Sequence, residues 1–363
     1  MTPIIRQLWL SALVLTCFST VGAQDSTHKK PKLVVFPAMT RSVETSWAFG
    51  GAASYTFRAS KTDSISRTSS LQFGALYSLR KQLVSSFRGT QYLHNEKWIF
   101  NEQVSFSSFP DKFWGLGKNT LDGKSEDYSF KQMYVYLHFM KKIAPRLFGG
   151  LLYEYQRVWD IKYQPGGLFD QQQIDGRYNY HVSGLGLSLT YDSRNHAFYP
   201  TKGFFAQGYF NHFSKVTGSQ FPYTNFVLDF RKFMPAGREG VFAAQAWLFG
   251  NIGKSVPLRS QAAFGGDNTM RGYYQGRFRD LQQFVLQGEY RRHLYKKIGI
   301  VAFASCGNVA HDINALNFQN LKYSFGGGLR YALNASEKLN LRIDYGIGKG
   351  QNSGFYFQLA EAF

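Results

Sequence analysis

The residues able to do covalent chemistry show no spacing that singles out a reactive centre. A serine hydrolase needs a histidine beside the nucleophile and a third group that orients it, but His196 and His212 stand in expected strands or turns without such company. The remaining histidines are scattered, with no pair at metal-binding spacing. Residues 115–119 combine glycines with a lysine, as a phosphate-binding loop does, but Asn119 stands where a hydroxyl residue is required. The sequence therefore predicts no enzyme, no metal site and no cofactor.

One long connection, from about Asn251 to Asp280, carries the most distinctive charged motif. It contains Phe264-Gly265-Gly266-Asp267 and then Met270-Arg271-Gly272-Tyr273. Connections of this length are usually functional or folded back onto the protein. Arg271, Gly272 and Tyr273 are therefore the leading candidates for a functional site.

A second motif, Asp192-Ser193-Arg194, is followed by Pro200 and Gly203. Proline and glycine shape the turn into the next expected strand, and Asp192 falls on the polar face of its own strand. A well-capped hairpin accounts for these residues without any further role, and that structural interpretation is preferred.

The elements that carry these motifs are strands, because apolar and polar residues alternate along most of the chain. About fifteen segments show this period of two, with a further short strand possible over 33–36. The pattern is clearest near the end, where Leu339, Leu341, Ile343, Tyr345 and Ile347 oppose Asn340, Arg342, Asp344, Gly346 and Gly348. Asp344 is thereby placed on the polar, inward face of its strand.

The composition favours a barrel in a membrane over a soluble β-sandwich. Aromatic residues make up 17% of the chain, with 34 Phe, 23 Tyr and 36 Gly. A membrane barrel needs an apolar outer face, aromatic girdles and a polar lumen, and closure pairs the backbone groups that lipid leaves unsatisfied. We predict an all-β fold: a sixteen-stranded, transmembrane antiparallel β-barrel over 33–363, with the long connection folded into its lumen.

The start of the chain is typical of a secretory signal peptide. Arg6 precedes an apolar run over 8–18, and small residues end at Ala23. We expect cleavage after Ala23, then a short polar periplasmic tether over 24–32. The predicted location is the bacterial outer membrane.

The chain ends in alternating apolar residues that finish on Phe363, which is typical of the signal that directs barrels to the outer membrane. Glu361 interrupts the apolar positions, and we expect it at the periplasmic rim.

The formal net charge of +19 suits contact with anionic outer-membrane lipid and lipopolysaccharide. A basic lumen and basic loops in water would account for it equally well. Export argues against nucleic acid as a partner. Cys306 is the one cysteine left after cleavage, so no internal disulfide is expected.

The long-loop motif, Asp192 with Arg194, and the terminal Phe363 together closely resemble the BamA/TamA superfamily, the bacterial surface-antigen family. The resemblance covers essentially all of the mature chain, and the five strands expected after the loop agree with the sixteen-stranded layout of that family. In such proteins the Arg-Gly-aromatic tip folds back into the barrel.

The resemblance implies that Arg271 pairs with acidic residues on inner strand faces. Glu289 matches one of these partners. The other acid belongs to a Phe-x-Asp-x-Gly pattern in which Ser305 here replaces the Asp. A buried arginine needs a second acceptor, so we expect Asp344 to supply it. Asp192 and Arg194 are expected to support the neighbouring inner wall.

Periplasmic POTRA domains precede the barrel in BamA and TamA, whereas the residues between Ala23 and the first clear strand are too few for a domain. We therefore expect the barrel domain alone, aiding insertion or translocation of proteins or lipids at the outer membrane. Client outer-membrane proteins or a separate periplasmic partner are the expected protein partners. A passive, anion-preferring pore and a structural surface barrel are the alternatives.

Overall fold

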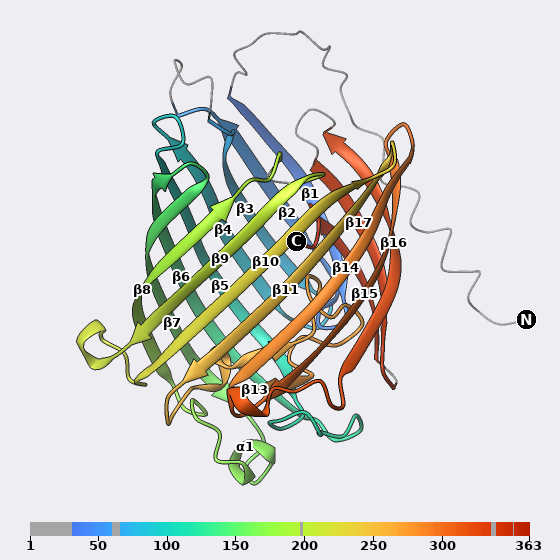
Figure 1. Ribbon diagram of the computed structural model, residues 1–363. Helices are drawn as coiled ribbons and strands as arrows, with labels where there is room; N and C mark the ends of the chain where they lie inside the picture. The colour runs from blue at the N-terminus through green and yellow to red at the C-terminus, as the bar shows by residue number, and fades with distance from the viewer. Residues whose placement is uncertain (1–30, 60–65, 197–198, 335–338, 351) are drawn as a thin grey trace, which may run out of the picture. The chain divides into compact units, whose positions relative to one another are not determined.

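The computed structural model describes residues 31–59, 66–196, 199–334, 339–350 and 352–363. The predicted signal peptide (1–23) and most of the predicted tether (24–32) lie outside these ranges. Sixteen strands form one antiparallel sheet in chain order, interrupted only by a small inserted hairpin (Figure 1). The strands are β1 (Lys32–Ser42), β2 (Ser46–Phe57), β3 (Ser69–Ser78), β4 (Leu83–Leu93), β5 (Trp98–Phe113), β6 (Glu126–Ala144), β7 (Leu147–Lys162), β8 (Tyr180–Asp192), β9 (Gly203–Phe213), β10 (Tyr223–Ala236), β11 (Gly240–Ile252), β14 (Gln282–Tyr295), β15 (Ile298–Ala310), β16 (Lys322–Asn334), β17 (Leu339–Gly348) and β18 (Ser353–Leu359).

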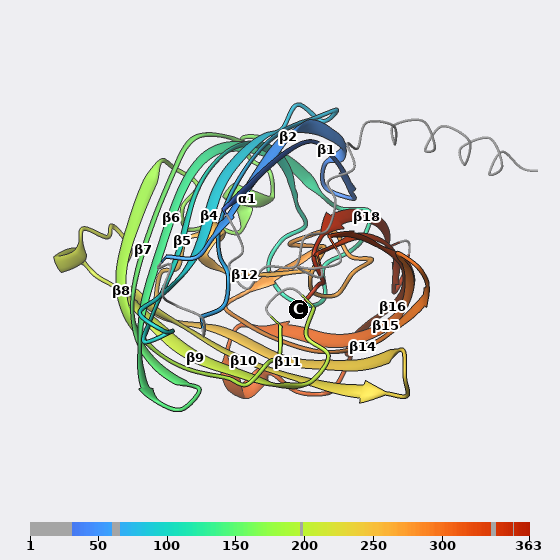
Figure 2. The ribbon, with the colours of Figure 1, turned by 90° about the horizontal axis from the view of Figure 1, so that it is seen from above.

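The sheet curls into a barrel, which brings its first and last strands together (Figure 2). Every internal strand is hydrogen-bonded to both neighbours, but no backbone ladder joins β1 to β18 in the described residues. Side chains make the contact instead: Thr40 Oγ1 donates to the carbonyl of Phe357 at 2.6 Å, and the Arg41 guanidinium lies 5.7 Å from the ring of Phe355. This junction, the seam, is therefore held differently from the rest of the wall.

The alternation of apolar and polar residues places side chains on the outer and inner faces of the barrel, as expected. On β8, Leu185, Leu187 and Leu189 are each more than half exposed on the outer face, whereas the polar residues between them face inward. The prediction of an all-β, sixteen-stranded barrel is confirmed.

Strand β1 is longer than the short segment expected over 33–36. The run Leu33-Val34-Val35-Phe36 hides a period of two, and Pro37 argues against a strand. Proline is tolerated here because β1 lies at an edge of the sheet, where one side has no ladder to donate to.

The two ends of the barrel differ in the length of their connections. At the end we call the loop end, the connections are longer and include α1 (Leu168–Gln171) and the 3₁₀ turns Lys215–Thr217, Leu258–Ser260 and Ile313–Ala315. At the opposite end, the turn end, most connections are short. Short turns face the periplasm in outer-membrane barrels, and long loops face outward. No helix among the described residues is long and apolar enough to cross a membrane.

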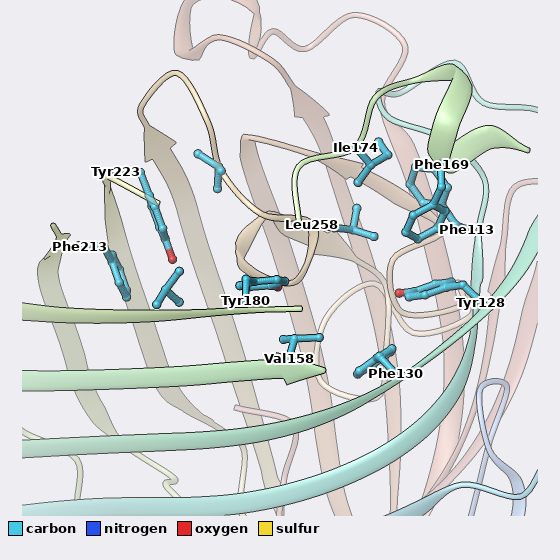
Figure 3. Close-up of a cluster of buried hydrophobic side chains, with 12 residues drawn as sticks. Phe113, Tyr128, Phe130, Val158, Phe169, Ile174, Tyr180, Phe213, Tyr223 and Leu258 are labelled. Atoms are coloured by element: carbon cyan, nitrogen blue, oxygen red, sulfur yellow. The ribbon is translucent and has the colours of Figure 1, made fainter. Parts of the chain in front are cut away.

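An apolar cluster fills one side of the loop end (Figure 3). Phe169 of α1 packs edge-on against Phe113 of β5, with ring centres 4.8 Å apart. The ring centre of Tyr128 of β6 is also 4.8 Å from that of Phe169. Leu258 contributes from the connection that follows β11. The cluster thus ties loops to the wall and fixes the base of the long connection.

Candidate functional site

The connection between β11 and β14, residues 253–281, is the plug loop. Its short strands β12 (Ala262–Phe264) and β13 (Phe278–Asp280) pair as a hairpin, and the segment between them is largely buried, with Met270 and Arg271 fully so. In Figure 2 the connection that contains β12 crosses the interior of the barrel. The loop therefore occupies the lumen, and Arg271 lies near its tip.

Arg271 contacts two carboxylates on the inner wall. Its Nη1 lies 2.5 Å from Oδ2 of Asp344 on β17, and its Nη2 donates to Glu289 on β14. The guanidinium also covers the ring of Phe303 at 3.5 Å. All three charged side chains are inaccessible to solvent. The structure thus brings Arg271, Glu289 and Asp344 together. Asp344 supplies the second carboxylate, because position 305 is a serine in this chain.

Glycines allow the tip to touch the wall. Gly272 has φ +114°, and a Cβ there would lie 2.8 Å from backbone atoms of β17. A Cβ on Gly346 of β17 would lie 2.5 Å from the carbonyl of Arg271. The Gly272 amide donates to the hydroxyl of Tyr356 at 2.9 Å. Backbone of the plug loop and backbone of the wall are therefore in direct contact, which only glycine permits.

Tyr273 anchors the loop beside Arg271. Its hydroxyl donates to the carbonyl of Tyr323 at 3.0 Å and accepts the Lys349 amide at 2.8 Å. Its ring packs on Phe264 and Phe278 of the plug hairpin. Within the motif, Arg271 therefore makes ionic contacts, Gly272 makes backbone contacts and Tyr273 makes aromatic contacts.

The Arg271 site extends into a larger charge network that sequence reasoning missed. Glu289 also accepts from Arg291 at 2.7 Å, and Asp344 accepts from Arg330 at 2.5 Å. Arg330 in turn donates to Glu361 at 2.7 Å. The one sequence signal for these arginines was the two-residue alternation of the strands, which places Arg291 and Arg330 on the same inward face as Glu289 and Asp344.

The last residues depart from the sequence prediction. Strand β18 ends at Leu359, and Ala360 adopts φ +65°, which breaks the alternation on which the expectation rested. Glu361 is consequently buried in the inner network near the turn end of the barrel, beside Arg330 and Asn340. Phe363 lies beyond the strand, 6% exposed, where its carbonyl accepts from Arg291 at 3.1 Å.

A second anchor of the plug loop lies on β5, on the opposite side of the barrel from β14 and β17. Asp111 accepts hydrogen bonds from the hydroxyls of Tyr274 at 2.8 Å and Tyr128 at 2.9 Å. Arg259 and Arg279 of the plug loop approach the same carboxylate at 3.3 and 3.8 Å. No motif marked Asp111, because its partners in the plug loop lie more than a hundred residues away in the chain.

A third anchor lies at the loop end. Arg277 donates to Asp122 at 2.6 Å and to Thr120 Oγ1 at 2.6 Å, both in the β5–β6 connection. Burial tends to raise the pKa of Asp122, but hydrogen bonds and the positive charge of Arg277 hold it below its ordinary value. In the first connection, Glu44 accepts the Gln275 amide at 2.6 Å, and burial raises the pKa of that carboxyl.

The Asp192 motif lies at the turn end and shares no contact with Arg271 in the described structure. Asp192 accepts from Arg194 at 2.9 Å and from Arg67 of the β2–β3 connection at 2.7 Å. Gly203 has φ +113°, and a Cβ there would lie 2.3 Å from the Ser193 carbonyl. Pro200 is buried in the same connection, and the contact between Asp192 and Arg67 links the β8–β9 connection to the β2–β3 connection.

One serine–histidine pair was also missed: His138 Nε2 lies 2.6 Å from Ser188 Oγ on the inner wall. The other ring nitrogen faces only the Tyr136 hydroxyl, at 3.4 Å, and the surrounding amides are committed to strand ladders. The pair therefore lacks oxyanion donors. Among the described residues no group of three His, Cys, Asp or Glu side chains could hold a metal ion.

The barrel and its lumen-filling loop define an outer-membrane β-barrel of the surface-antigen type. Residues 39–363 match the Omp85 superfamily domain, and the chain belongs to that superfamily. It is therefore an outer-membrane protein. A search of curated protein sequences found no match.

Solved structures share the fold at low sequence identity. BamA from Haemophilus ducreyi lacking POTRA domains 1-3 is 12% identical with a TM-score of 0.57, over 91% of this chain and 70% of that one. CdiB from Acinetobacter baumannii is 11% identical with a TM-score of 0.56, over 92% and 65%. CdiB from Escherichia coli is 10% identical with a TM-score of 0.58, over 90% and 62%. The chain thus spans less than two thirds of either CdiB structure.

Proposed function

We propose that this barrel aids the insertion of proteins into, or their passage across, the outer membrane, with no catalytic step of its own. The observation that carries the proposal is the seam. In the described part of the chain, β1 forms a ladder with β2 alone, so the backbone groups on its other edge are not committed to a sheet. Unpaired strand edges recruit incoming strands by β-augmentation.

The plug loop supports the same proposal. Three anchors hold it in the lumen, through Arg271, Asp111 and Asp122. A barrel plugged in this way keeps the membrane sealed while its wall opens at the seam. Arg271, Gly272 and Tyr273, with Glu289 and Asp344, would thus brace the barrel and would not contact the client.

Client barrel proteins, or a separate periplasmic protein that delivers them, are the proposed protein partners. Lipopolysaccharide is the proposed lipid contact of the loop end, since exposed lysines such as Lys124 and Lys349 lie there without an acidic partner among the described residues. Export by the predicted signal peptide is part of the same proposal.

Locking the seam tests the proposal. Cysteines at Thr40 and Gln358, in a Cys306→Ala background, would be joined by a short bis-thiol crosslinker. The control joins Ala52→Cys to Gly74→Cys, which face each other across the β2–β3 ladder. We expect the seam crosslink, and not the control, to deplete other outer-membrane proteins in host cells that depend on this chain. Equal outer-membrane proteomes in both strains would exclude the seam as the working site.

A passive anion-preferring pore is the second candidate. It is favoured by Arg88, whose strand position faces the lumen and which has no acidic partner among the described residues. Anion-selective conductance of the intact protein, together with an unchanged outer membrane after its depletion, would favour the pore.

A further inference from the structure

The exposed charge of the barrel is divided unevenly between its two ends. Exposed basic side chains follow most turns at the turn end, and we call them the basic rim: Lys97, Lys141, Lys142, Arg146, Lys202, Lys232, Arg238, Arg292, Lys296 and Lys297. Among the described residues of that end, Glu239 is the one Asp or Glu side chain that is more than half exposed.

The loop end carries paired cations as well as cations that are unpaired among the described residues, such as Lys124 and Lys349. Lys112 lies 3.2 Å from Asp127, and Lys131 lies 2.9 Å from Asp160. No side chain of the basic rim forms a hydrogen bond or ion pair with a described residue. Positive charge with no carboxylate partner among the described residues attracts anions from solution or from the membrane surface.

Aromatic and aliphatic side chains accompany the basic rim on the outer surface. Lys141 Nζ lies 5.2 Å from the ring of Trp98, and Lys296 Nζ lies 5.0 Å from that of Tyr295. Leu294 and Tyr295 are 51% and 63% exposed. Aromatic rings at headgroup level beside lysines that reach past them toward water are typical of a membrane–water interface.

The place of the basic rim on the barrel indicates which kind of anion binds it. The basic rim extends over turns from β4–β5 to β14–β15, and strand alternation points Lys141, Lys232 and Arg292 outward, toward lipid. Lipid surrounds a barrel on all sides, whereas a protein partner meets one sector. We infer that the basic rim binds the headgroups of anionic glycerophospholipids, such as phosphatidylglycerol, in the periplasmic leaflet.

The experiment measures the lipid shell of the full chain in nanodiscs that contain equal phosphatidylglycerol and phosphatidylcholine. A rim variant carries Lys141→Gln, Lys142→Gln, Lys296→Gln and Lys297→Gln. A matched control removes the same charge from exposed loop-end lysines, with Lys124→Gln, Lys215→Gln, Lys254→Gln and Lys349→Gln. Native mass spectrometry counts the lipids that remain bound, and heat-modifiable mobility verifies folding.

We expect phosphatidylglycerol to be enriched about threefold or more around the wild type and the control, and not around the rim variant. About 0.5 M salt should reduce the wild-type enrichment, because it screens exposed charges beyond a few ångströms; this arm tests the proposal even if the rim variant misfolds. Unchanged enrichment in a folded rim variant would overturn the proposal. Equal loss in both variants would assign the effect to net charge and overturn the rim as its site. None of these outcomes depends on insertion activity.

Discussion

Tyr274 and Asp111 join the plug loop to the wall that faces away from the partners of Arg271. The tyrosine hydroxyl donates to Asp111 of β5 at 2.8 Å, only three positions along the chain from the arginine that pairs with β14 and β17. The tip is therefore held from both sides of the lumen. A loop held at one side could swing aside, whereas this one must lose both contacts to open the barrel.

Arg271→Ala should destabilise the barrel by about 3–5 kcal/mol, because removing one partner leaves buried charge without compensation. Urea unfolding in lipid vesicles, read by heat-modifiable mobility, measures the loss. Arg238→Ala, in an exposed turn, is the control and should be neutral in vesicles of phosphatidylcholine, which offer the basic rim no anionic headgroup. Arg279→Ala is not a suitable control, since Arg279 is 2% exposed and lies 3.8 Å from Asp111. Equal stability of the Arg271 and Arg238 variants would contradict the bracing role.

Tyr274→Phe removes one hydrogen bond to Asp111 and keeps the ring, so we expect a loss of about 1 kcal/mol. Combined with Arg271→Ala, it should raise single-channel conductance more than either change does alone, because both sides of the tip are then released. Conductance of the double variant that matches Arg271→Ala would show that the β5 anchor does not retain the plug.

Gly346→Ala places a methyl group against the backbone of Arg271, where the gap is 2.5 Å. We expect it to displace the tip at a cost of about 1–3 kcal/mol. Gly74→Ala on β3 is the matched control, since a Cβ there meets nothing within 4 Å. Protease cleavage of the plug loop in the folded barrel should increase for Gly346→Ala alone. Protection of both variants would argue against direct backbone contact.

Asp122 gives the plug loop a dependence on pH at its outer anchor. Its pKa is lower in the folded chain than in the unfolded one, so its contribution to stability is complete above the ordinary carboxyl pKa of about 4. That contribution disappears as pH falls through the lower, folded value. Asp122→Asn should flatten this acid limb and cost only about 0.5 kcal/mol at neutral pH, since Asp122 is half exposed and Arg277 keeps its hydrogen bonds to Thr120. Acid profiles of urea unfolding that coincide for the two proteins would rule out Asp122 as the group.

The barrel could be predicted from the sequence because a period of two survives in strands such as β8 and β17. Glu289 and Asp344 could be placed on the inner face for the same reason. The β5 anchor could not be predicted, because Asp111 meets Tyr274 only through the register and curvature of the whole sheet. Glu361 was expected at the periplasmic rim, but its burial inside the barrel could not be predicted, because the positive φ of Ala360 ends the alternation and turns the chain inward.

The inward turn at Ala360 links the residues that follow β18 to the plug loop. Glu361 holds Arg330, Arg330 holds Asp344, and Asp344 holds Arg271. Because Glu361 follows β18, Arg330 gains its second carboxylate only when the last strand is in place. A barrel without these residues would keep the contact between Arg330 and Asp344, but the buried Arg330 guanidinium would have one carboxylate fewer.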